Sequence, residues 1–264
     1  MSRFDSLEFE RPKAGPRRHS GETTGTPVRD CSYFREAAGE EYRLGRLEAA
    51  LRSYSRALEC DTTACGCWLM QVRILIELEE YTEAGVWADK ALEMFPDHPD
   101  LLAARAVICA RTGMDSRAMA FSDSAMAGRD GSPYTWLARG EVLLARRGRM
   151  AGECLLRAIA ESPATVDRAW MNVEVARVLR RYGRRSEALY HAKAAQAAMP
   201  LHAAVALEVG LCQESLGLPD AAQSFTEALQ LDPLCDQARL RLARRRRSLW
   251  GYVKRWFTRS DNGA

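Results

Sequence analysis

The chain has 264 residues, of which 47% are hydrophobic and 28% are charged, and its formal net charge is +3. This composition is ordinary for a soluble, ordered protein, and no run of 18 apolar residues is present that would predict a membrane-spanning helix. Eight cysteines are spread along a chain that has no apolar leader at its N-terminus. This distribution favours free thiols in a reducing cytoplasm.

Residues 1–30 are rich in proline, glycine and charged residues, which is a composition typical of disorder. Within them, apolar and acidic residues are mixed in one short stretch that holds Phe4, Asp5, Leu7, Glu8 and Phe9. An apolar island of this kind in a disordered segment predicts a short docking motif that becomes ordered when it binds.

A repeat begins at residue 31. Large apolar residues recur in steps of 34 residues at Phe34, Trp68, Leu102 and Trp136. Two series of alanines follow the same rhythm: Ala50, Ala84, Ala118, Ala151, Ala188 and Ala221, then Ala57, Ala91, Ala125, Ala158, Ala195 and Ala228. Alanines at these positions let two antiparallel helices approach closely.

Glycines and prolines punctuate each unit of the repeat. Turn glycines are expected at Gly45, Gly113, Gly148, Gly183 and Gly217, and closing prolines at Pro96, Pro163, Pro200 and Pro233. Glycine accepts the left-handed conformation that caps a helix, and proline cannot continue one. The second unit has Glu79 in place of the glycine, so its turn should be less well capped. Each unit is therefore predicted to be a helical hairpin whose core is completed by its neighbours.

This pattern resembles the tetratricopeptide repeat over roughly residues 31 to 233. The resemblance implies an all-α, right-handed α-solenoid of about six helical hairpins followed by a C-terminal capping helix. The expected repeats are 31–64, 65–98, 99–132, 133–165, 166–202 and 203–234. A capping helix with a basic aromatic extension is expected at 235–258, and a disordered tail at 259–264.

Enzymatic chemistry is not predicted. The sequence has no phosphate-binding glycine loop and no recognisable catalytic motif around its four histidines. Cys60, Cys65 and Cys67 are close together in sequence, but they contain no CxxC pair and have no histidine nearby. They are interpreted as small residues at helix packing positions. The sequence therefore predicts no catalytic residue, no metal site and no cofactor.

The resemblance implies that the first helix of each repeat lines a concave groove in which a partner's peptide or helix lies. The residues expected in this groove are Arg35, Tyr42, Arg43, Leu69, Arg73, Arg111, Tyr134, Glu141, Trp170, Arg177, Arg180 and Arg181. Guanidinium groups bind carboxylates through paired hydrogen bonds, so an acidic peptide is the expected ligand. The alternative is that these arginines form solvated faces of an arginine-rich protein. The carboxylate clamp of chaperone-binding relatives is missing, because Arg35 and Gly39 stand where Lys and Asn are expected.

The C-terminal segment is the second candidate site. From residue 234 onward there are nine Lys/Arg and two Asp/Glu, whereas the rest of the chain has a small acidic excess. The residues expected to dock are Arg244, Arg245, Arg246, Arg247, Trp250, Lys254, Arg255, Trp256 and Phe257. A basic face with tryptophan and phenylalanine favours an anionic membrane surface. The alternatives are a helix that folds back on the last repeat, contact with a partner protein, and, less favoured, contact with nucleic acid.

Together, these features predict a non-enzymatic cytoplasmic scaffold or adaptor that binds a peptide segment of another protein in its groove. The alternative is a peripheral membrane assembly factor that is recruited by its basic aromatic C-terminal helix. Nothing in the sequence indicates an oligomeric state.

Overall fold

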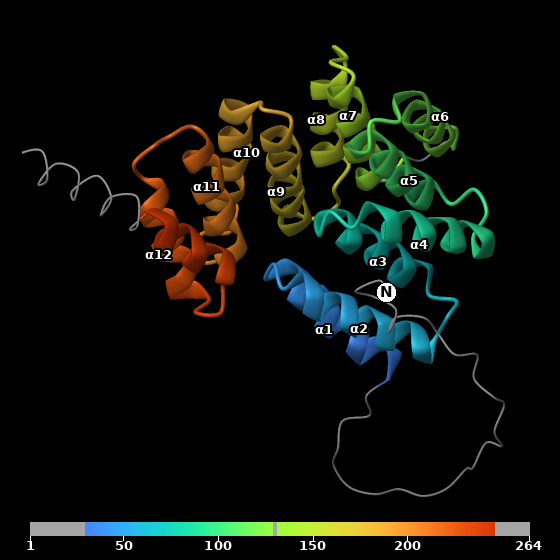
Figure 1. Cartoon of the computed structure of the whole chain (residues 1–264), viewed down its shortest axis with the longest axis horizontal. Helices are drawn as coiled ribbons and strands as arrows, with labels where there is room; N and C mark the ends of the chain where they lie inside the picture. The colour runs from blue at the N-terminus through green and yellow to red at the C-terminus, as the bar shows by residue number, and fades with distance from the viewer. Residues whose placement is uncertain (1–29, 129–130, 246–264) are drawn as a thin grey trace, which may run out of the picture. The chain divides into compact units, whose positions relative to one another are not determined.

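The structure is a computed structural model, and it describes residues 30–128 and 131–245 (Figure 1). Within these residues there are helices and connecting loops but no strand, so the predicted all-α fold is confirmed. The chain divides into two compact units, Met1–Pro96 and Asp97–Ala264. The expected docking motif at Phe4–Phe9 and the tail from residue 246 onward lie outside the described residues.

The first unit contains two helical hairpins. They are formed by α1 (Cys31–Arg43) and α2 (Leu47–Cys60), and by α3 (Cys65–Glu77) and α4 (Tyr81–Met94). Trp68 of α3 and Trp87 of α4 are both buried, with their ring centroids 5.4 Å apart. The Trp68 indole also donates a hydrogen bond to the backbone carbonyl of Thr62, at 2.9 Å. The aromatic residue predicted from the repeat therefore lies in the core and fixes the loop that precedes its own helix.

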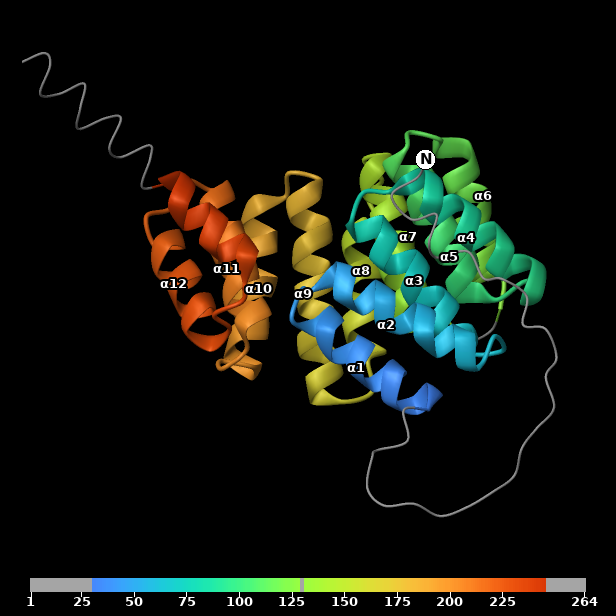
Figure 2. The same cartoon turned by 60° about the horizontal axis from the view of Figure 1, so that its bottom comes forward.

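The second unit contains four more hairpins, and the paired helices lie side by side (Figures 1 and 2). Its helices are α5 (Pro99–Arg111), α6 (Asp115–Met126), α7 (Pro133–Ala145), α8 (Ala151–Ala160), α9 (Thr165–Arg181), α10 (Arg185–Ala198), α11 (Ala203–Ser215) and α12 (Ala221–Leu231). α9 is 17 residues long, whereas the other first helices have 13 residues each. Residues 236–245 are also helical, and Ala238 and Leu242 pack against the cluster around Phe225.

Small residues set the close packing of each hairpin. The alanines predicted to lie at helix contacts are all buried in the second helices, with no more than 3% of their surface exposed. The first helices have a matching series of small or β-branched residues five positions before the helix end, which the sequence analysis did not identify. These residues are Ala38, Val72, Ala106, Gly140, Ala176 and Gly210, and all are buried. The two helices of each hairpin therefore approach closely from both sides.

All six hairpin turns close with the same hydrogen-bond pattern. In the first turn, Gly45 N–H donates to the carbonyl of Tyr42 at 3.0 Å, and Arg46 N–H donates to the carbonyl of Glu41 at 2.9 Å. The left-handed residue of the pattern is glycine in four turns and Glu79 in the second. In the fourth turn it is Arg147, with a φ of 56°, and not the predicted Gly148. Arg147 lies three steps of 34 residues after Gly45. The repeat period therefore predicts the left-handed residue of this turn correctly, whereas the presence of glycine does not.

Candidate binding surface

In the first unit, the structure brings together two of the residues predicted to lie in the groove. The Arg73 guanidinium of α3 lies 5.9 Å from the centre of the Tyr42 ring of α1, which is within range of a cation–π contact. Both side chains are half-buried, as is Leu69, whereas Arg35 and Arg43 are exposed. Arg35 and Arg43 are thus the predicted groove cations of this unit that are most accessible to a ligand.

In the second unit, Arg111 and Glu141 form a buried ion pair between successive first helices. The Arg111 Nε of α5 lies 2.7 Å from Glu141 Oε1 of α7, and a second hydrogen bond joins Nη2 to Oε2 at 3.2 Å. The two side chains are 6% and 3% exposed, respectively. The Tyr182 hydroxyl, just after α9, donates to the same carboxylate at 3.4 Å. Burial and then the Glu141 charge raise the pKa of Tyr182 well above its ordinary value.

A second ion pair of the same kind joins α9 to α11. Arg180 Nε donates to Glu208 Oε1 at 2.8 Å, and Arg177 Nε lies 3.6 Å from Glu208 Oε2. Only 3% of the Glu208 side chain is exposed. The thiol of Cys212 lies one turn further along α11, and its sulfur is 3.7 Å from Glu208 Oε1. Burial, together with the Glu208 charge, raises the pKa of this thiol to about 12.

These ion pairs change how the predicted groove residues are interpreted. Glu141 and Glu208 partly neutralise Arg111, Arg177 and Arg180. Two hydrogen bonds to the same carboxylate fix the guanidinium planes of Arg111 and Arg180. Their guanidinium donors are engaged in holding successive first helices together. The sequence analysis included Glu141 but missed Glu208. The available signal was an acidic residue with apolar residues on both sides of it in α11, because such an acid needs a cationic partner when it is buried.

The other predicted residues of the second unit occupy varied environments. Trp170 is half-buried, and its ring meets that of His202 edge-to-face, with centroids 4.8 Å apart. Tyr134 is also half-buried, and Arg181 is exposed at the end of α9. From the predicted tail, only Arg244 and Arg245 lie within the described residues. Arg244 is exposed, and Arg245 is half-buried.

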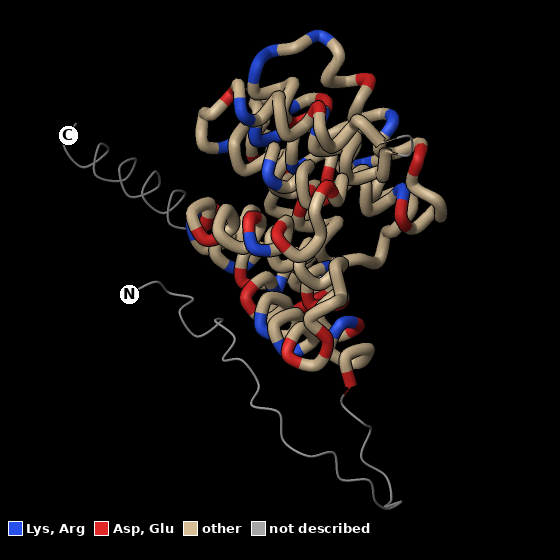
Figure 3. Tube along the Cα trace, turned by 90° about the vertical axis from the view of Figure 1, so that its right-hand side faces the viewer, with Lys and Arg blue, Asp and Glu red and all other residues tan. Residues whose placement is uncertain are grey.

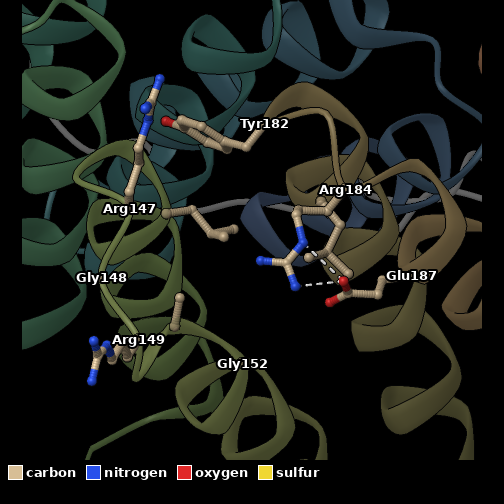
Figure 4. Close-up of a pocket in the computed structure, with 10 residues that line it drawn as sticks. Arg147, Gly148, Arg149, Gly152, Tyr182, Arg184 and Glu187 are labelled. Carbon is tan, nitrogen blue, oxygen red and sulfur yellow. Dashed lines mark hydrogen bonds and ion pairs between the residues drawn. The ribbon is translucent and has the colours of Figure 1, made fainter.

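A pocket of about 400 Å³ lies between the turn that joins α7 to α8 and the turn that joins α9 to α10 (Figure 4). Its apolar lining is formed by Leu144, Leu179 and the ring of Tyr182. Arginines from both turns line it as well, and one of these, Arg184, donates to Glu187 at 2.8 Å. The pocket was not predicted, because it depends on how two successive hairpin turns face each other.

Two further properties bear on the class of site. Within residues 30–128 and 131–245, no group of three or more His, Cys, Asp or Glu side chains is arranged to hold a metal ion. Across the same part of the chain, no helix combines the length and the apolar character needed to cross a bilayer. The eight cysteines are all free thiols, and five of them are buried.

Solved structures share this arrangement of hairpins. A tetratricopeptide repeat protein from Parabacteroides merdae matches with a TM-score of 0.51 and 17% identity, covering 82% of this chain and 84% of that one. The structure of the APC/C hetero-tetramer Cut9–Hcn1 matches with a TM-score of 0.50 and 14% identity, covering 81% of this chain. This chain has the tetratricopeptide-repeat fold. It spans 42% of the length of the chain matched in the Cut9–Hcn1 structure. No protein-family model and no curated protein sequence matches it.

Proposed function

We propose that this protein is a non-enzymatic scaffold or adaptor, and that the first helices of its repeats hold a peptide segment of another protein. The observation that supports this most directly is that two ion pairs with buried carboxylates, Arg111–Glu141 and Arg180–Glu208, connect successive first helices. These ion pairs connect α5 with α7 and α9 with α11. A surface held in this way loses little conformational entropy when it binds a ligand.

An acidic or carboxylate-bearing peptide remains the proposed ligand of this surface. Its support now rests on exposed arginines that were predicted for the groove, Arg35 and Arg43 in the first unit and Arg181 in the second. The other predicted arginines of the second unit are paired, Arg111 with Glu141 and both Arg177 and Arg180 with Glu208. The Cut9–Hcn1 structure contains two different kinds of chain, which accords with a role for this fold in assembly.

Affinity capture with purified full-length protein tests this proposal. A partner retained by the wild-type protein should be lost when Arg35→Glu and Arg43→Glu are combined, because two exposed charges of the proposed surface are reversed. Arg177→Glu is a poor choice for this test, since it would place a second carboxylate beside the buried Glu208. The matched control combines Arg52→Glu with Arg117→Glu, which reverses two exposed arginines on second helices. Equal retention by both variants would argue against the surface.

Recruitment to an anionic membrane is the second candidate function. It rests on the concentration of basic residues from residue 234 onward, where the sequence contains nine Lys/Arg and only two Asp/Glu. Co-sedimentation with vesicles of anionic lipid, with and without residues 244–264, tests it. Salt-sensitive binding that disappears on truncation is the expected result. Equal sedimentation of the two proteins would rule out the segment as a membrane anchor.

A further inference from the structure

The hairpin turns of the fourth and fifth repeats are strongly basic, and those on either side are not. Residues 146–149 and 181–185 contain six arginines and no acidic residue: Arg146, Arg147, Arg149, Arg181, Arg184 and Arg185. Counted from two residues before the left-handed position to two residues after it, the turn of the third repeat (111–115) contains one arginine and one aspartate, and the turn of the sixth repeat (215–219) contains no charged residue. Figure 3 shows the basic residues along the uppermost loop, which is the turn between α7 and α8. Within the second unit, the positive charge of the hairpin turns is thus concentrated in two adjacent turns.

The turn of the fourth repeat carries an arginine at a position where four of the other five turns carry glycine. Arg147 has a φ of 56°, and Gly45, Gly113, Gly183 and Gly217 occupy the equivalent position. A side chain in this left-handed conformation is disfavoured, because its Cβ comes too close to the following carbonyl oxygen. Unfavourable backbone conformations of this kind cluster at ligand-binding sites, where the side chain they position has a use.

The two arginines that flank the pocket are available to a ligand. Arg147 and Arg149 are exposed and extend in different directions from the same turn (Figure 4). Of the residues that the structure describes, none gives either guanidinium a hydrogen bond or an ion pair. Arg184, across the pocket, is held by Glu187 at 2.8 Å. Glu187 also lines the pocket, so the lining combines an apolar surface with three arginines and one carboxylate, and this carboxylate is paired with Arg184.

We propose that this pocket is a docking site for an acidic peptide of a partner protein, separate from the inner surface of the first helices. One large apolar side chain of the peptide enters against Leu144, Leu179 and the Tyr182 ring. Carboxylates on either side of it meet Arg147 and Arg149 through charge-assisted hydrogen bonds. The volume of about 400 Å³ lies within the roughly 300–1,000 Å³ of typical ligand pockets.

A peptide fits this site better than a nucleic acid does. Single-stranded nucleic acids are bound by aromatic side chains on which successive bases stack, alongside a basic track. Only one aromatic residue, Tyr182, lines this pocket, and its hydroxyl is already bonded to Glu141. The rest of the apolar lining is aliphatic, which suits an inserted side chain of a peptide.

Binding of a defined peptide to the full-length protein tests the proposal. The probe is a fluorescent peptide with one phenylalanine between two pairs of aspartates, and its anisotropy reports binding. Combining Arg147→Gly with Arg149→Ala should weaken binding at least about tenfold, with glycine chosen because it accepts the left-handed backbone. The control, Arg52→Ala with Arg117→Ala, removes the same charge elsewhere and should leave affinity within about twofold. A peptide with alanine in place of phenylalanine should bind about tenfold more weakly.

The same assay separates this site from the surface under Proposed function. The variant with Arg35→Glu and Arg43→Glu should bind the probe as the wild-type protein does. Loss of binding in that variant and not in the Arg147 and Arg149 variant would overturn the pocket and place the peptide on the first helices. The proposed pocket would also be overturned if the phenylalanine and alanine peptides bound equally well. The same holds if inorganic phosphate or a single-stranded oligonucleotide displaced the probe at a lower concentration than the unlabelled peptide does. Far-UV circular dichroism confirms that each variant is folded.

Discussion

A close helix contact in the second unit, between Gly210 and Phe225, predicts an unusual response to a small substitution. A Cβ atom added at Gly210 of α11 would lie 2.6 and 2.7 Å from two ring carbons of Phe225 in α12. Phe225 is fully buried among residues of α11, α12 and the helical segment 236–245. Its ring therefore cannot move aside freely. Gly210→Ala should destabilise the protein, although alanine is ordinarily the better residue inside a helix.

Two opposing terms set the magnitude of this effect. Replacing glycine by alanine within a helix stabilises it by up to about 1 kcal/mol. Forcing a methyl group into a packed core costs about 1–3 kcal/mol, and contacts below 3.0 Å place this site toward the upper end. The net change in the free energy of unfolding should be a loss of about 1–2 kcal/mol. Gly152→Ala in α8 is the control, because its Cβ would meet nothing within 4 Å and only the favourable helix term applies.

Urea denaturation, followed by circular dichroism and by tryptophan fluorescence, measures both variants. Two probes are needed because repeat arrays can unfold in more than one step. Gly210→Ala should lower the midpoint, whereas Gly152→Ala should leave it unchanged or raise it. A double-mutant cycle with Phe225→Leu should show that the cost of Gly210→Ala falls when the ring is removed. If Gly210→Ala raised the midpoint as Gly152→Ala does, the packing of α11 against α12 described above would be refuted.

Three further predictions follow from single features of the structure. Glu79→Gly should raise the free energy of unfolding by about 0.5–1 kcal/mol in urea titration, because Glu79 has a φ of 63°. Glu77→Gly, at the last residue of α3, should lower it. Arg180→Met should cost about 2–3 kcal/mol, because the buried Glu208 keeps only Arg177 as a cation nearby, and adding Glu208→Gln should recover part of the loss. Maleimide labelling of the native protein at neutral pH, read by mass spectrometry, should modify three thiols and leave the five buried thiols unmodified until the protein unfolds. Burial not only blocks access to these thiols but also raises the pKa of Cys67 to about 11. If a buried thiol reacted as fast as an exposed one, the described packing of the core would be wrong. The three reactive thiols are Cys31, Cys60 and Cys65.

The fold could be predicted from the sequence because its determinants are local and repeated. The second-helix alanines, the closing prolines and most of the turn glycines recur at fixed spacing, and each has a direct physical effect on the backbone or on helix contacts. The fourth turn shows where residue type misleads. The turn was predicted at Gly148 because glycine favours the left-handed conformation, but Arg147 has that conformation. The position of the turn, and its hydrogen bonds, follow from where α7 ends.

The binding surface was harder to predict, because its charges depend on pairings between helices. Arg111 and Glu141 are 30 residues apart, and Arg180 and Glu208 are 28 apart, so neither pairing leaves a local signature. Helical spacing placed these arginines on the first helices but could not show which carboxylate each one meets. The pocket was missed for the same reason, since its lining comes from two hairpins.

The ion pairs and the basic turns together indicate how charge is divided in the second unit. Arginines near the ends of α5 and α9 that meet Glu141 or Glu208 stabilise the stacking of first helices, and replacing them should act mainly on stability. Arg147 and Arg149 lie a few residues beyond the end of α7, outside these ion pairs, and replacing them should act mainly on binding. The two groups of arginines can be distinguished by measuring both the free energy of unfolding and the affinity for the acidic peptide for each variant. An Arg180→Met protein that kept its stability but lost the acidic peptide, or a doubly substituted turn that lost stability but kept the peptide, would reverse this division of roles.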